Sequence, residues 1–179
     1  MRYWSALALA AALAAAGCGP RRTPPPVPTT AVAVDGVPFV AQRGRDCGPA
    51  ALAMVLGFFG RPQSLEDLTA RLYRDDLEGT LTIDLLLEAR RQGLEARQVR
   101  GDLESLRATL ADGRPLLVFL DLGRVAWAPR RHFAVAIGLT PEGVVLHSGD
   151  RPGVVLPIDR FMAAWARTDH WALDVRRPA

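Results

Sequence analysis

The sequence contains no lysine, and all 22 of its basic residues are arginine. A Gly-rich nucleotide-binding loop of the Walker type ends in lysine, so we expect no use of ATP. Nineteen acidic residues are interleaved with the arginines, which leaves a formal net charge of +3 and no basic stripe. This distribution argues against nucleic-acid binding.

Cysteine and histidine are also scarce, with two and three copies. No cluster of Cys, His and carboxylate residues has the spacing of metal ligands, so we predict no metal and no other cofactor. The 179 residues suffice for one folded domain, and 49% apolar with 23% charged residues is a globular composition. We therefore expect a single catalytic or binding unit.

The apolar run at the N-terminus, residues 7–16, is too short for a permanent membrane span, which needs about 20 residues. With Arg2 before it and small residues leading to Cys18, it has the layout of a secretory signal. Residues 13–18, Leu-Ala-Ala-Ala-Gly-Cys, resemble a bacterial lipobox in which Ala15 stands where leucine is usual. The resemblance implies cleavage before Cys18 and acylation of its thiol; an ordinary cleaved signal is the alternative.

The chain is thus divided into a signal peptide (1–17), a lipidated Cys18 with a Pro-rich tether (18–30), a folded domain (31–175) and a short tail (176–179). Cys18 is followed by Gly19 rather than by aspartate. By resemblance to sorted lipoproteins, this favours the outer membrane over the inner one, with the domain facing the periplasm.

Hydrophobic periodicity predicts helices first and strands afterwards, which is an α+β order. Ser64, Thr82 and Asp102 are the N-cap candidates. Helices are expected over residues 47–59, 64–73, 83–93, 103–110 and 159–167. After an extended piece at 37–41, strands are expected over residues 115–122, 132–139, 144–148, 154–157 and 171–175, in a mostly antiparallel sheet.

Cys47 begins the first of these helices, followed by Gly48 and Pro49. The dipole and free N–H groups of a helix N-terminus favour a thiolate, so this position suits a nucleophile. If Cys18 carries lipid, Cys47 has no disulfide partner. A buried cysteine used as a small apolar side chain is the alternative reading.

A cysteine nucleophile needs a general base, and His132 opens an apolar strand from which it can face a cleft. His147 and His170 are better explained as structural histidines. Gln42, five residues before Cys47, can offer its side-chain amide to an oxyanion together with the Cys47 backbone N–H.

Together these features resemble the bacteriocin-leader-processing (double-glycine) cysteine peptidases, a papain-like family, and its stand-alone lipoprotein forms. The match is strongest over residues 42–56, Gln-Arg-Gly-Arg-Asp-Cys-Gly-Pro-Ala-Ala-Leu-Ala-Met-Val-Leu, and extends over residues 37–175. The resemblance implies a papain-like fold with Cys47 as nucleophile, His132 as general base and Gln42 as oxyanion donor.

The family's third residue, an Asp or Asn that orients the imidazole, falls on Ser148 in this sequence. A serine accepts a hydrogen bond but supplies no negative charge. Asp150 is an alternative, and His147 is a weaker one. Either the Cys–His pair works unaided, or activity is reduced, or the chain is a binding module on a peptidase fold.

We therefore predict a cysteine peptidase that acts on peptides outside the cytoplasm through an acyl-enzyme, anchored to a membrane by its lipid. The alternatives are a catalytically weak peptide-binding lipoprotein and a related amide-cleaving or transfer activity in the cell wall. An export or envelope complex is a possible partner.

Overall fold

The structure is a computed structural model, and it describes residues 31–123 and 130–178. The expected signal peptide, Cys18 and the tether up to residue 30 lie outside the described residues. No helix in the described part of the chain combines the length and apolar character that crossing a membrane requires.

The described chain contains five helices and nine strands. The helices are α1 (Cys47–Phe58), α2 (Leu65–Leu72), α3 (Thr82–Arg91), α4 (Leu103–Ala111) and α5 (Ile158–Ala166). The strands are β1 (Val32–Ala33), β2 (Tyr73–Arg74), β3 (Gly79–Thr80), β4 (Glu95–Arg100), β5 (Leu116–Asp121), β6 (Arg131–Thr140), β7 (Gly143–Ser148), β8 (Arg151–Leu156) and β9 (Trp171–Arg176).

The α+β fold class is confirmed. Strands β4, β9, β5, β6, β7 and β8 lie side by side in that order, and β1 pairs with β6 outside this path. Neighbouring strands run antiparallel. The short strands β2 and β3 form a separate hairpin.

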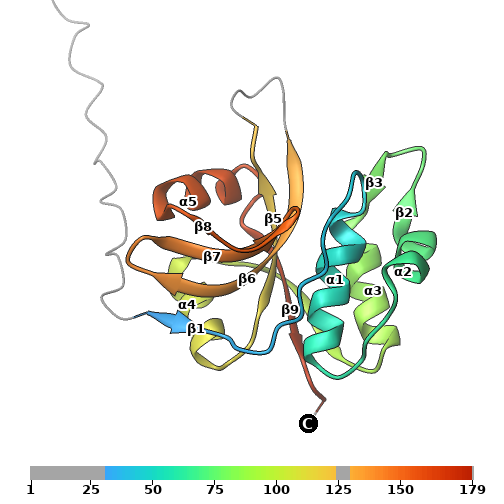
Figure 1. Cartoon of the computed structure of the whole chain (residues 1–179), viewed down its shortest axis with the longest axis horizontal. Helices are drawn as coiled ribbons and strands as arrows, with labels where there is room; N and C mark the ends of the chain where they lie inside the picture. The colour runs from blue at the N-terminus through green and yellow to red at the C-terminus, as the bar shows by residue number, and fades with distance from the viewer. Residues whose placement is uncertain (1–30, 124–129, 179) are drawn as a thin grey trace, which may run out of the picture.

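Helices cover both faces of the sheet (Figure 1). Successive side chains of a strand point to opposite faces, so β5 sends Leu117 toward α1, α2 and α3 but Leu116 and Val118 toward α4 and α5. Two apolar cores result, one on each face. The N-terminal helices therefore pack on the sheet as expected, and α4 and α5 add a second layer.

Helix α1 is the central element of the first core. Its residues 48–56 are all buried, and it packs against β6. An apolar helix without a polar face is stable only inside a protein, and the small side chains of Ala50, Ala51 and Ala53 let neighbouring elements approach closely. The core therefore holds the residue at its N-terminus, Cys47, in a fixed place.

Capping residues explain the starts of α2 and α4. The Ser64 side chain accepts a hydrogen bond from the Asp67 N–H, and Asp102 forms a capping box with Ser105. The expectation for Thr82 is wrong, because Thr82 is the first residue of α3 and Leu81 is its N-cap.

The strands differ from the expected ones in several places. Residues 37–41 form no strand, and the chain pairs with β6 earlier, at Val32 and Ala33. Strand β4 was not expected, because its sequence, Glu-Ala-Arg-Gln-Val-Arg, is mostly polar, as suits an edge strand. Strand β9 continues through Arg176, one residue beyond the expected end of the domain.

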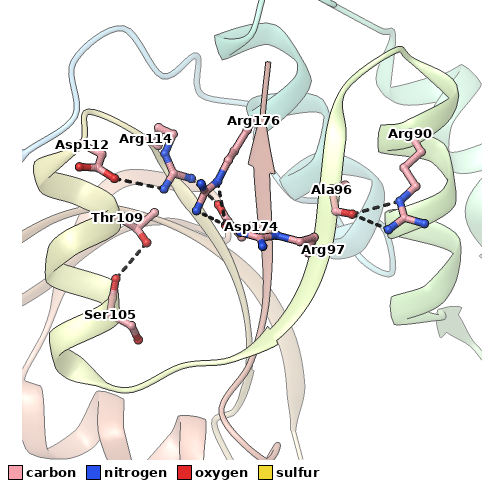
Figure 2. Close-up of polar contacts among 9 residues, drawn as sticks. All are labelled: Arg90, Ala96, Arg97, Ser105, Thr109, Asp112, Arg114, Asp174 and Arg176. Atoms are coloured by element: carbon pink, nitrogen blue, oxygen red, sulfur yellow. Dashed lines mark hydrogen bonds and ion pairs between the residues drawn. The ribbon is translucent and has the colours of Figure 1, made fainter. Parts of the chain in front are cut away.

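An ion-pair cluster joins β4 and β9 to the start of β5 (Figure 2). The buried Asp174 carboxylate pairs with Arg114, with Arg176 at 2.9 Å and with Arg97 at 3.2 Å. Burial alone would raise the pKa of Asp174, but hydrogen bonds from Arg176 and Arg114 hold it below its usual value. The carboxylate therefore stays charged and ties this edge of the sheet together.

Candidate active site

Cys47 is the first residue of α1 and is half-buried. Asp46 precedes it as the N-cap, but the Asp46 carboxylate accepts the Arg43 N–H at 2.7 Å and does not cap the helix. The N–H groups of the first turn therefore remain directed toward the thiol end of the helix. Gly48 is needed here because a Cβ at that position would lie 2.8 Å from the Thr80 Cβ of β3.

The helix N-terminus does not make Cys47 acidic, contrary to the expectation from the sequence. Burial raises the pKa of the thiol above its ordinary value, and backbone hydrogen bonds from Phe133 and Gly48 oppose this only in part. The carboxylate of Asp46 raises it further. The resting group at neutral pH is therefore the thiol.

His132 lies at the second position of β6, and its ring is held by Ser148 of β7. His132 Nε2 and Ser148 Oγ are 2.9 Å apart. When Nε2–H donates this bond, the lone pair is on Nδ1, which is the form that a general base requires. The structure thus brings together two of the residues singled out in the sequence.

The electrostatic surroundings keep the imidazole of His132 neutral. Burial and the nearby Arg130 charge lower its pKa to about 4. Ser148 provides no charge to counteract this. At pH 7 both the thiol and the imidazole are neutral, so a thiolate forms only when the proton moves during reaction.

Asp150 is not brought to the imidazole. Its side chain is 85% exposed and faces Arg151 at 3.7 Å. His147 is also excluded from that role, because it is a buried histidine bonded to the Val37 carbonyl (3.2 Å) and the Gly153 N–H (3.2 Å). The structural interpretation of His147 is therefore confirmed.

Cys47 lies near the strand that carries His132, because Gln42 Nε2 bonds the carbonyls of both Cys47 and Phe133. Among the hydrogen bonds of the described residues, none joins the thiol to the imidazole. Catalytic hydrogen bonds often tighten only when substrate binds, so this geometry is that of a resting site.

Gln42 is buried, and its amide is already engaged. Nε2 lies 3.1 Å from the Phe133 carbonyl and 3.3 Å from the Cys47 carbonyl, and Oε1 accepts the Gly149 N–H at 2.8 Å. The predicted oxyanion donor is therefore beside the nucleophile, but in this structure its N–H groups point at backbone carbonyls.

Asp121, at the end of β5, was missed in the sequence. Its carboxylate accepts the N–H groups of Gly123 and Arg130, both at 2.8 Å, and so closes the base of the hairpin that leads to His132. These bonds, the one from Arg130 first, lower the pKa of Asp121. The sequence signal that could have pointed to Asp121 is a carboxylate at the end of β5, the strand that pairs with the strand carrying His132.

The described residues contain no group of three His, Cys, Asp or Glu side chains that could hold a metal ion.

Known proteins share both sequence and fold with this chain. A model of the Peptidase C39 family matches residues 37–169. The transport/processing ATP-binding protein ComA of Streptococcus pneumoniae is 32% identical over 124 residues, which is 67% of this chain and 16% of ComA. The chain thus spans about a sixth of that relative's length.

Two solved structures are similar in fold. One is a double-glycine-motif protease from an AMS/PCAT transporter in complex with the leader peptide, with a TM-score of 0.63 and 22% identity over 82% of this chain and 99% of that one. The other is the peptidase domain of Streptococcus ComA, with a TM-score of 0.65 and 22% identity over 80% of this chain and 100% of that one.

Proposed function

The chain belongs to the Peptidase C39 family and is a cysteine-type peptidase, and from that premise we propose that Cys47 and His132 cleave peptide bonds through an acyl-enzyme. The observation that carries the proposal is the placement of the thiol. Cys47 is the first residue of a buried helix, and Gln42 Nε2 bonds both its carbonyl and that of Phe133. Phe133 follows His132, whose ring is held by Ser148.

The chemistry follows from the neutral state of both groups. Cys47 Sγ attacks the peptide carbonyl carbon while its proton passes to Nδ1 of His132. The C–N bond of the tetrahedral intermediate then breaks, and the imidazolium returns the proton to the leaving amine. Water, deprotonated by the same ring, hydrolyses the thioester and frees the thiol.

The oxyanion of the intermediate needs donors close to Sγ. The N–H groups of Cys47 and Gly48 point from the start of α1, and the same groups lower the pKa of the thiol in part. We propose these N–H groups together with the Gln42 amide, which would turn one N–H away from a carbonyl as the intermediate forms.

We propose that the substrate is a peptide carrying a double-glycine leader. The solved relative bound to a leader peptide is a double-glycine-motif protease, and its fold covers most of this chain. A leader peptide ending in Gly-Gly is the first substrate to test, with the same peptide ending in Ala-Ala as its control.

The proposed site of action is outside the cytoplasm, on an anchor formed by lipidated Cys18. The support is the signal-like N-terminus and the lipobox resemblance of residues 13–18. Labelling of cells with a fatty-acid probe tests this directly. Wild-type protein should carry the label and partition with the outer membrane, and Cys18→Ala should lose the label.

Iodoacetamide alkylation and peptide hydrolysis together test the catalytic assignment. Cys47→Ser should abolish both, and His132→Ala should slow both. Equal alkylation of the wild type and His132→Ala across the pH range would refute a base role for His132.

A second candidate function is peptide binding with little turnover. The observation that favours it is Ser148, since a hydroxyl leaves the imidazolium without a stabilising charge. This candidate predicts that no acyl-enzyme accumulates with any leader peptide, and that peptide binding survives Cys47→Ser.

A further inference from the structure

Gln42 makes hydrogen bonds to three segments of the chain, two of which are distant from it in sequence. Its Nε2 donates to the carbonyls of Cys47 (3.3 Å) and Phe133 (3.1 Å), and its Oε1 accepts from the Gly149 N–H (2.8 Å). Its own N–H donates to the Gly149 carbonyl at 2.8 Å. Phe133 and Gly149 lie 91 and 107 residues away along the chain.

Each of these segments carries one residue of the site. Cys47 is the nucleophile itself, Phe133 follows His132, and Gly149 follows Ser148. We propose that Gln42 is a positioning residue that holds Cys47, His132 and Ser148 in their relative positions before substrate binds. This inference rests on the roles given to Cys47 and His132 in the proposed function.

The chemistry of the side chain fits this role. A primary amide has two N–H donors and one carbonyl acceptor, and all three groups are engaged here. Glutamate would place a carboxylate oxygen against two carbonyl oxygens, and methionine has the length but no hydrogen bonds. Among the side-chain hydrogen bonds of the described residues, only those of Gln42 join the start of α1 to the sheet.

A positioning residue acts before substrate is attacked, and this timing distinguishes it from an oxyanion donor. An oxyanion donor contributes only after a carbonyl has been attacked. Iodoacetamide is attacked at its CH₂ carbon: the S–C bond forms, iodide leaves and no oxyanion appears. Alkylation therefore reports the arrangement of thiol and imidazole alone, whereas peptide hydrolysis reports both.

The test compares the pH dependence of alkylation and hydrolysis in the full chain for the wild type, His132→Ala, Gln42→Met and Gln42→Glu. Gln42→Glu keeps the acceptor for the Gly149 N–H. The matched control is Gln92→Met, since Gln92 is a half-buried glutamine that bonds only Glu88, on α3. Circular dichroism confirms that each variant is folded.

We expect Gln42→Met to slow alkylation at pH 7 by about 10- to 100-fold, the cost of misplacing reacting groups by about 1 Å, and to give the pH profile of His132→Ala. Gln42→Glu should do the same, and Gln92→Met should match the wild type.

If Gln42→Met is alkylated at the same rate as the wild type, the proposal is overturned. If the variant then loses hydrolysis alone, Gln42 is an oxyanion donor only. Failure of both Gln42 variants to fold would also overturn it and assign Gln42 to the stability of the fold. If the wild type and His132→Ala alkylate identically, the proposed function itself fails, and this inference fails with it.

Discussion

A carboxylate in place of Ser148 should raise the pKa of His132 toward the ordinary value of a histidine. Ser148 Oγ lies 2.9 Å from His132 Nε2, and no negatively charged group of the described residues raises the pKa of the ring. Ser148→Asp supplies one at the same place. It also tests whether a serine there limits the enzyme.

The size of the effect follows from the distance. Two unit charges about 4 Å apart attract by about 4 kcal/mol at an effective dielectric constant of 20. Desolvation of the new carboxylate offsets part of this, and an opposite charge at such a distance commonly shifts a pKa by about 1 to 3 pH units. From its present value of about 4, the pKa of His132 should rise by that amount.

The assay is kcat/KM for a leader peptide between pH 3.5 and 9. A base must be unprotonated to act, so the acid limb of the profile reports the pKa of His132 in the free enzyme. We expect this limb near pH 4 in the wild type and about 1 to 3 pH units higher in Ser148→Asp. kcat on the plateau should rise at least about 10-fold, with about 10⁴ as a ceiling from triads that lose their carboxylate.

Ser148→Asn is the matched control, since its side chain has the size of aspartate without the charge. It should leave the acid limb where the wild type has it. If Ser148→Asp and Ser148→Asn gave the same limb, residue 148 would not act on the catalytic base, and the role drawn from the His132–Ser148 bond would be wrong.

Three further changes test other parts of the structure. Gly48→Ala should cost about 1–3 kcal/mol in the free energy of unfolding because the new Cβ meets Thr80, and Thr80→Ser should recover part of this in the double variant, as measured by urea unfolding. Asp174→Leu should cost about 3 kcal/mol or more by leaving three arginines without their buried carboxylate, and its thermal midpoint should fall. The pKa of His132 is lower in the folded state than in the unfolded chain, so only the unfolded state takes up this proton as the pH falls from about 6.5 to 4. The free energy of unfolding therefore decreases across that window. His132→Gln should flatten this part of the curve of unfolding free energy against pH.

Local signals in the sequence were sufficient for most of the fold. Asp102 and Ser64 mark helix starts by caps that form within four residues, and continuous apolar runs mark β5 and β6. The same reasoning misses β4, because an edge strand has one free side and tolerates polar residues such as Arg97 and Gln98. Helical spacing alone does not determine burial, since Ile83 and Leu87 lie 44% and 54% exposed on α3.

The site was less accessible to sequence reasoning. Cys47 and His132 stand in recognisable sequence motifs, and counting along the family pattern places Ser148 at the position that orients the imidazole. The net pKa of Cys47 could not be deduced, because it depends on how far burial outweighs the helix N-terminus. The contacts of Gln42 with Phe133 and Gly149 depend on three loops and strands meeting in space, and no local pattern encodes that.

Because Ser148 carries no charge, hydrogen bonds rather than an ion pair should align Cys47 and His132. An ion pair between thiolate and imidazolium would draw Cys47 and His132 together by itself, and salt would weaken that attraction at exposed sites. With both groups neutral at pH 7, their alignment depends on directional hydrogen bonds to backbone and hydroxyl groups, those of Gln42 and Ser148. Such bonds are local and barely sensitive to ionic strength, so the site should keep its geometry where salt varies, although burial leaves it with a weak base.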